Sequence, residues 1–161
     1  MFTSFDEMPD YARLWVYQAE RKMSSQELEF VRANTSLFID QWKAHGQDLR
    51  ASFDIKHDQF LILSVDESQS EASGCSIDAS VHLIKALEDE LKISFMTSGH
   101  VAFLQNDEIK LYPFGQLKSL ATEKVIEPET TVFDNTVQNL GDFRKRWTVE
   151  SKDSWVKRYF R

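Results

Sequence analysis

The only cysteine of the chain, Cys75, lies in the segment ASGCSIDAS (72–80), where a polar loop leads into an amphipathic stretch. The sequence places this thiol at or just before the first turn of a helix, where unpaired amides and the helix dipole stabilise an anion. A thiolate in such a place can act as a nucleophile or a redox sensor. Against this role, Glu71 and Asp78 are negative, and no second cysteine is present to resolve an oxidised thiol. The alternative is a small, partly buried cysteine in a tight loop.

Two further residues are candidates to assist the thiol through the tertiary fold. Asp66 follows the apolar run FLILSV, and strand ends often hold functional sites. His45 precedes Gly46 at the expected end of a helix, where a cationic imidazole suits the dipole and the simpler role is capping. His82 lies about two helical turns after Cys75, roughly 10 Å along the axis, which makes it a poor direct base. The candidate catalytic residues are therefore Cys75, His45 and Asp66.

The sequence contains no spacing typical of a metal or nucleotide site. Asp66 and Glu67 are paired acids, but no H-x₃-H or C-x₂-C pattern adds nitrogen or sulfur ligands. A P-loop needs G-x-x-x-x-G-K-[ST], because glycine amides and a lysine wrap the phosphates. None of the five glycines is followed by lysine. We therefore expect no metal, no cofactor and no ATP hydrolysis of the Walker type.

Charge is distributed unevenly along the chain, whose formal net charge is −7. Residues 1–140 carry 12 Lys/Arg and 23 Asp/Glu (−11), whereas residues 141–161 carry 7 and 3 (+4). The acidic body repels phosphates, so we do not expect nucleic acid as a partner. The basic tail also contains five aromatic residues, and its candidate binding residues are Trp147, Trp155, Arg158 and Tyr159.

A tail of this composition can have two roles. It can dock on a protein partner or on a second copy of the chain, or it can pack on the acidic body of its own chain. We favour the second role, with Trp155 and Phe160 buried, because an exposed patch of five aromatic residues is unusual in a monomer.

Hydrophobic periodicity indicates the elements that carry these residues. Ser24 and Glu27 match the S-x-x-E capping box, and an apolar stripe at helical spacing follows as far as Trp42. LRASFDIK alternates as a half-buried strand does, and FLILSV is typical of a central strand. In chain order we expect a strand at 12–19, a helix from Ser24 to His45–Gly46, strands at 49–56 and 60–65, a helix at 76–92, and a hairpin at 100–105 and 108–112.

This order predicts an α+β fold. An antiparallel sheet would carry two main helices on one face in the ferredoxin-like βαββαβ order, with an extra hairpin strand and C-terminal helical segments. Another α+β arrangement with different strand neighbours is the alternative. No linker, repeat or low-complexity tract is present, so residues 1–161 are expected to form a single domain with 141–161 packed on it.

Four stretches, ARLWVYQAERKMSSQE, FIDQWKAHGQDL, SGCSIDASVHLI and KDSW, resemble a family of small bacterial proteins of about this length. Genome projects often label that family "ABC transporter ATPase", although its function is uncharacterised. The resemblance extends over nearly the whole chain and brings no established catalytic residue. The residues do not support the label, because neither a Walker A motif nor an LSGGQ-like signature is present.

The sequence as a whole favours a binding or interaction protein without catalytic activity. The alternative is a small thiol-dependent enzyme or redox-sensing protein that uses Cys75, and a third reading is a small-molecule pocket between the sheet and the tail. The N-terminal stretch lacks the features of a secretory signal, and the longest apolar runs are too short to span a bilayer. With one cysteine, a cytoplasmic protein without a membrane partner is expected.

Overall fold

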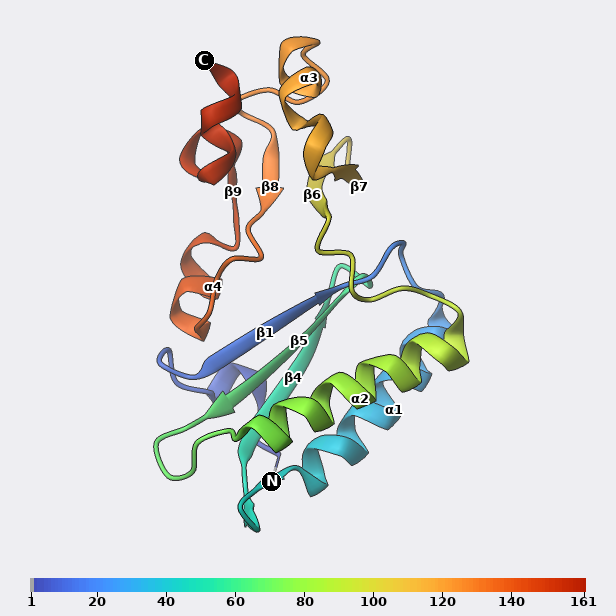
Figure 1. The fold of residues 1–161 in the computed structure, drawn as a ribbon, viewed down its shortest axis with the longest axis vertical. Coiled ribbons are helices and arrows are strands. Elements are labelled where there is room, and N and C mark those ends of the chain that lie inside the picture. Colours follow the sequence, from blue (N-terminus) through green and yellow to red (C-terminus); the bar gives the residue numbers. More distant parts are fainter. Residues whose placement is uncertain (1) are drawn as a thin grey trace. The chain divides into compact units, whose positions relative to one another are not determined.

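The computed structural model describes residues 2–161, which form two compact units (Figure 1). Unit 1 contains the described residues up to Thr97 together with Gln138–Gly141, and unit 2 contains Ser98–Val137 and Asp142–Arg161. The backbone therefore passes between the units three times. Because the units are interleaved, no one segment separates them, and this explains why the sequence contains no tract that resembles a linker. The single domain expected over 1–161 stays a prediction, because interleaved units can unfold together.

Unit 1 combines helices with an antiparallel sheet. Its elements are η1 (Phe5–Glu7), β1 (Arg13–Gln18), α1 (Ser25–Gln41), the small hairpin β2 (Lys43–Ala44) and β3 (Gln47–Asp48), β4 (Arg50–Lys56), β5 (Phe60–Asp66) and α2 (Gly74–Leu91). The main sheet has the order β1-β5-β4, and both neighbouring pairs are antiparallel. β5 is therefore central, as its continuous apolar run predicts, and every residue of it is buried.

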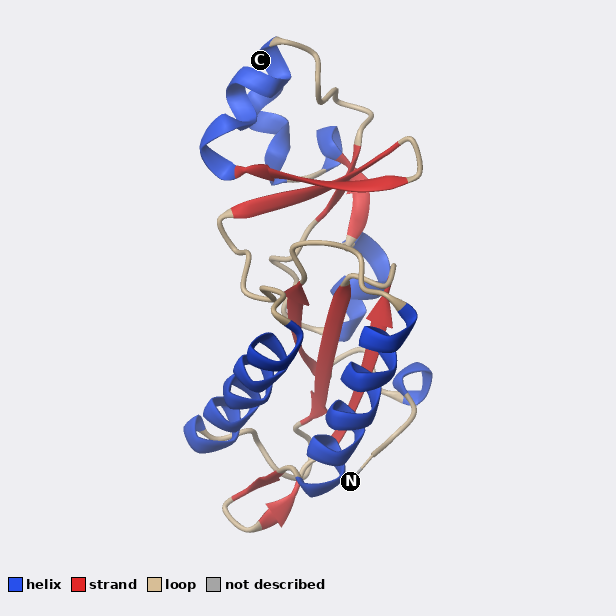
Figure 2. Cartoon of the chain, turned by 90° about the vertical axis from the view of Figure 1, so that its right-hand side faces the viewer, coloured by secondary structure: helices blue, strands red, loops and turns tan. Residues whose placement is uncertain are grey.

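Both long helices begin with a capping box. The Ser24 hydroxyl accepts a hydrogen bond from the Glu27 amide at 3.2 Å, and the Glu27 carboxylate accepts one from the Ser24 amide at 2.8 Å. α2 starts at Gly74, two residues earlier than expected, because Ser73 is its N-cap. The two helices pack on one face of the main sheet (Figure 2), where the core contains Val31, Ile39, Ile84, Leu87, Ala51, Ile55, Leu61, Leu63 and Val65.

The end of α1 differs from the prediction. The helix stops at Gln41 instead of His45–Gly46, and Trp42 already has an extended backbone with φ −72° and ψ 124°. His45 and Gly46 have φ values of 52° and 77° and form the two-residue turn between β2 and β3. Positive φ at both central residues is typical of the type I′ turns that close many two-residue hairpins. The glycine is thus used for a turn and not for a helix C-terminus, and His45 caps no helix.

Unit 2 has a sheet of its own. Its elements are β6 (His100–Gln105), β7 (Glu108–Pro113), η2 (Phe114–Gln116), α3 (Leu117–Thr122), β8 (Thr131–Phe133), α4 (Leu140–Arg146, which begins in the 138–141 segment), β9 (Thr148–Glu150), η3 (Ser151–Asp153) and η4 (Trp155–Phe160). The sheet order is β7-β6-β8-β9, with antiparallel neighbours. Its core contains Phe103, Leu117, Ile126, Val132 and Val156.

The α+β class is confirmed, whereas the ferredoxin-like order is not. β6, which was expected in the sheet of the two main helices, pairs with β7 and β8 in unit 2. At the edge of β1 that such a strand would occupy, the returning segment binds instead. The Leu14 amide donates to the Gln138 carbonyl at 3.1 Å, and the Leu140 amide donates to the Ala12 carbonyl at 2.9 Å. The backbone of residues 138–140 thus forms hydrogen bonds with this part of the exposed edge, and no fourth strand within residues 2–161 pairs there.

The C-terminal residues are an integral part of unit 2. β9 pairs with β8 and forms one edge of the sheet, and the Val156 side chain is fully buried. Trp155 and Phe160, which were expected to be buried, are half-buried. The last segment of the chain therefore contributes both to the core of unit 2 and to its surface.

Candidate functional site

Cys75 is the second residue of α2, and its side chain is exposed. The turn around it is closed by the capping box, in which the Ser73 hydroxyl accepts from the Ser76 amide at 3.1 Å and the Ser76 hydroxyl accepts from the Ser73 amide at 2.6 Å. The thiol thus lies in the first helical turn, as the sequence predicts. The alternative of a partly buried cysteine does not match its exposure.

The accessibility of Cys75 leads to a labelling prediction. Iodoacetamide is expected to alkylate the folded chain completely, at a rate no slower than that of the urea-unfolded chain at the same pH, because the thiol is exposed in the first turn of α2. Mass spectrometry at timed quenches measures both rates. A clearly slower rate in the folded chain would count against any chemical role for this thiol.

Asp66 ends β5, and its carboxylate is already engaged by neighbouring groups. Its Oδ2 accepts a hydrogen bond from Arg50 at 3.2 Å, and its Oδ1 accepts one from the Ser68 amide at 3.0 Å. Burial raises the pKa of Asp66, but hydrogen bonds from Ser68 and Tyr11 and the charge of Arg50 outweigh it, so that the pKa lies below its ordinary value. The side chain therefore ties the end of β5 to β4, because Arg50 is its cross-strand partner.

The structure does not join the three catalytic candidates. Within residues 2–161, no hydrogen bond or ion pair links Cys75, His45 and Asp66, and His45 is exposed in its hairpin turn. The described part of the chain also contains no group of three or more His, Cys, Asp or Glu residues that could hold a metal ion. A catalytic role for these residues stays a prediction.

Trp147 differs from the other binding candidates because it belongs to the interior. Its ring stacks on Phe143 with centroids 4.7 Å apart and contacts Phe133 at 5.0 Å. The indole Nε1 donates to the Asn135 side-chain oxygen at 2.9 Å. Only 5% of the residue is exposed, so Trp147 packs α4 against β8 and offers little surface to a ligand.

Trp155, Arg158 and Tyr159 lie together with Phe114, and we name these four residues the aromatic–cationic surface. The Phe114 and Trp155 rings are stacked with centroids 5.8 Å apart, and Tyr159 meets Trp155 edge-on at 6.4 Å. The Arg158 guanidinium carbon lies 5.5 Å from the Trp155 centroid and 5.7 Å from that of Tyr159. Phe114 is 50% exposed, and Trp155 and Tyr159 are half-buried, so all three rings are partly accessible to solvent.

Short 3₁₀ helices position this surface. With three residues per turn, η4 places Trp155 and Arg158 on the same side of the helix. Val156 anchors η4 in the core, and the Ser154 hydroxyl caps it by accepting from the Val156 amide at 3.0 Å. Phe114 comes from η2, far earlier in the chain. Sequence patterns could not identify Phe114 as part of this surface, because one phenylalanine after a hairpin forms no periodic pattern.

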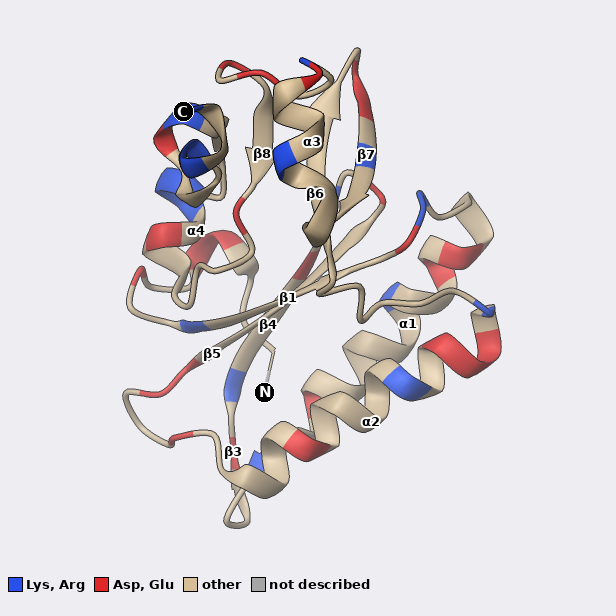
Figure 3. Ribbon diagram, turned by 45° about the horizontal axis from the view of Figure 1, so that its top comes forward, with Lys and Arg blue, Asp and Glu red and all other residues tan. Residues whose placement is uncertain are grey.

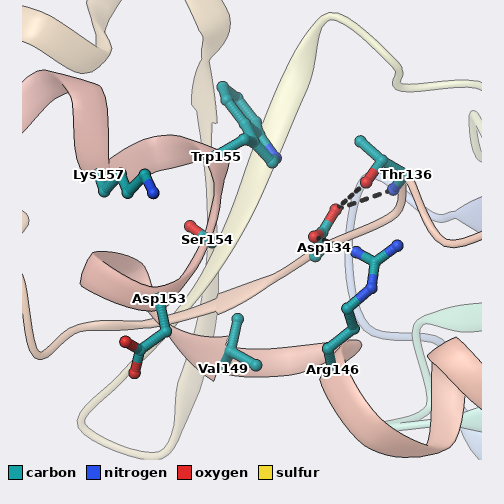
Figure 4. A pocket seen from close by; sticks show the side chains of 8 residues that line it. All are labelled: Asp134, Thr136, Arg146, Val149, Asp153, Ser154, Trp155 and Lys157. Atoms are coloured by element: carbon teal, nitrogen blue, oxygen red, sulfur yellow. Dashed lines mark hydrogen bonds and ion pairs between the residues drawn. The ribbon is translucent and has the colours of Figure 1, made fainter.

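A pocket of about 300 Å³ includes Trp155 in its wall (Figure 4). Its lining residues are Asp134, Thr136, Arg146, Val149, Asp153, Ser154, Trp155 and Lys157. The buried Asp134 accepts from the Thr136 amide at 3.0 Å and from the Thr136 hydroxyl, and its other oxygen accepts from Arg146 at 3.0 Å. Asp134 and Arg146 therefore neutralise each other within the lining.

The net negative charge of the chain comes from unit 1. Unit 1 contains 9 Lys/Arg and 17 Asp/Glu residues, a net charge of −8, whereas unit 2 contains 10 and 9, a net charge of +1. Lys and Arg residues, blue in Figure 3, are frequent on the turns next to the C-terminus. The aromatic–cationic surface therefore lies in the part of the chain that repels an acidic partner least.

Neither a protein-family model, nor a curated protein, nor a solved structure was found to match the chain. Across residues 2–161, no helix is both long enough and apolar enough to cross a membrane. The proposals below therefore depend on the geometry of this chain alone.

Proposed function

We propose that this chain is a non-catalytic binding protein, and that its unit 2 docks on an acidic segment of a partner protein through the aromatic–cationic surface. The observation that carries this proposal is the position of Arg158 over two half-buried rings, Trp155 and Tyr159. Tryptophan, tyrosine and arginine are the residues that most often dominate the binding energy of protein interfaces. Here all three are in contact before any partner binds.

The arrangement suits an acidic segment for two physical reasons. The Trp155 and Tyr159 rings hold the guanidinium in place, so less side-chain entropy is lost when a carboxylate pairs with it. Phe114 adds exposed apolar area that a partner can cover, which makes part of the affinity independent of salt. A second copy of the chain is one source of acidic segments, because unit 1 has a net charge of −8.

The proposal predicts binding to a defined acidic probe. The fluorescence anisotropy of labelled poly-L-glutamate is expected to rise when the full chain is added. Trp155→Ala and Arg158→Ala are each expected to weaken this binding by about tenfold or more, as is typical of residues that dominate an interface. Arg32→Ala is the matched control, because Arg32 is an exposed arginine of α1 in unit 1.

Each result of this experiment has a defined meaning. Absence of binding, or equal binding by the Arg158→Ala and Arg32→Ala variants, contradicts the proposal. Stronger binding of a single-stranded oligonucleotide than of poly-L-glutamate would identify nucleic acid as the ligand instead. If light scattering shows a dimer that Arg158→Ala dissociates, the partner is a second copy of the chain.

A thiol-dependent enzyme or redox sensor is the second candidate function, and the exposure of Cys75 in the first turn of α2 favours it. A cytoplasmic location is part of the proposal and is supported by the single cysteine and by the resemblance to small bacterial proteins. Hydrolysis of ATP is not proposed, since the chain lacks a Walker A motif.

A further inference from the structure

We infer that the pocket beside the aromatic–cationic surface binds a small organic carboxylate with a flat, apolar body. The inference concerns the space between Asp134, Arg146, Trp155 and Lys157, a separate ligand site that shares only Trp155 with the aromatic–cationic surface. It goes beyond the proposed function, and it can hold if partner docking fails.

The charged side chains that line the pocket favour an anionic ligand. Arg146 is paired with Asp134, and its second nitrogen reaches Asp142 at 3.4 Å. The Lys157 ammonium, by contrast, has no hydrogen bond or ion pair within residues 2–161. Figure 4 shows this ammonium pointing towards the middle of the pocket, while the Asp153 carboxylate points away from it. The unpaired charge that a ligand meets is therefore positive.

The hydroxyl groups that line the pocket already donate hydrogen bonds within the protein, so the cationic side chains are left to bind a charged ligand. The Ser154 hydroxyl donates to the Ser151 carbonyl at 2.9 Å and accepts from the Val156 amide at 3.0 Å. The Thr136 hydroxyl donates to Asp134. Lys157 and the remaining N–H groups of the half-exposed Arg146 are thus the donors available to a carboxylate.

The apolar part of the wall determines the rest of the ligand. The Trp155 ring and the Val149 side chain line the pocket, and an aromatic ring gains from stacking on tryptophan. The volume of about 300 Å³ lies at the lower end of the range for small-molecule sites, so a single ring with a carboxylate is the size that fits. A neutral ligand would leave Lys157 unpaired, and a cation would be repelled by it.

The test compares three probes that differ in one feature each. Phenylacetate is expected to shift the indole N–H signal of Trp155 in ¹H–¹⁵N spectra of the full chain, and Trp155→Phe identifies that signal among the four tryptophans. Phenylacetamide has the same shape without the charge, and acetate has the charge without the ring. Both are expected to bind at least about tenfold more weakly, since each loses a charge-assisted contact or a stacking contact.

Two lysine variants complete the test. Lys157→Met keeps the apolar stem without the charge and is expected to weaken phenylacetate binding by about tenfold. Lys152→Met is the control, because Lys152 pairs with Glu150 at 3.3 Å and does not line the pocket.

The inference is overturned if phenylacetate leaves the Trp155 signal unchanged, if phenylacetamide binds as tightly, or if the two lysine variants behave alike. The Arg158→Ala variant separates this site from the partner surface, since it is expected to lose poly-L-glutamate and to keep phenylacetate. The comparison of the three probes on the wild-type chain decides the matter even if a lysine variant fails to fold.

Discussion

Replacing Trp42 by alanine is expected to lower the free energy of unfolding by about 3–5 kcal/mol, the usual cost of truncating a buried tryptophan. Trp42 is 2% exposed, and its ring contacts Phe38 at 4.9 Å and Trp15 at 6.1 Å. Its Nε1 donates to the Ser76 carbonyl at 2.9 Å. One side chain therefore joins the end of α1 to β1 and to the first turn of α2, which carries Cys75.

Two further variants separate the contributions to the Trp42 result. Trp42→Phe keeps most of the ring area but removes the donor to Ser76, so its expected cost is about 1–3 kcal/mol. Leu37→Ala changes a 63% exposed residue of the same helix and is expected to stay within about 0.5 kcal/mol of wild type. Urea denaturation followed by circular dichroism measures all three. A Trp42→Ala effect as small as that of Leu37→Ala would contradict the packing described here.

Asp66→Asn is expected to destabilise the chain by about 1–3 kcal/mol at neutral pH, although asparagine has nearly the same size as aspartate. The variant loses the charge that pairs with Arg50 at 3.2 Å. The exposure of Arg50 moderates the cost, since solvent screens the pair on that side. This result would identify Asp66 as a structural residue of the β4–β5 pair.

The pH dependence of the Asp66→Asn effect has a defined sign. Because folding lowers the pKa of Asp66, the ionised carboxylate stabilises the fold fully above the unfolded value of about 3.9. This stabilisation is lost as the pH falls through the lower folded value. The difference between wild type and variant is therefore expected to be constant from neutral pH to about pH 5 and to shrink below about pH 4.

The matched control for the pH series is Asp78→Asn, since Asp78 is an exposed aspartate of α2. It is expected to leave the stability within about 0.5 kcal/mol of wild type at each pH above 5. An Asp66→Asn difference that stays constant to about pH 2 would show that the carboxylate charge does not stabilise the fold.

Composition identified the region of the candidate site, but it did not distinguish among its residues. The basic and aromatic residues after 140 pointed to Trp147, Trp155, Arg158 and Tyr159 together. The two tryptophans have equal apolar character, yet Trp147 is buried between Phe143 and Phe133 while Trp155 lines a pocket. The tryptophan that becomes buried is the one that α4 and β8 cover. The local sequence pattern around each tryptophan does not show which one that is.

The local elements of unit 1 were predictable because each depends on neighbouring residues. The Ser24–Glu27 capping box, the alternation of LRASFDIK and the apolar run of β5 all specify backbone hydrogen bonds or one face of an element within a few residues. The prediction for the end of α1 was wrong because the burial of Trp42 and its hydrogen bond to the Ser76 carbonyl depend on residues far apart in the chain.

The sequence by itself determined the α+β class, the start of α1, the central position of β5 and the helical setting of Cys75. Only the tertiary structure decided that β6 joins a second sheet, that Asp66 pairs with Arg50, and that Phe114 meets Trp155 and Lys157 faces a pocket. The physical reason is that caps and periodic patterns act over one or two turns. Strand partners and surface clusters instead depend on contacts between residues far apart in the chain, which no local pattern encodes.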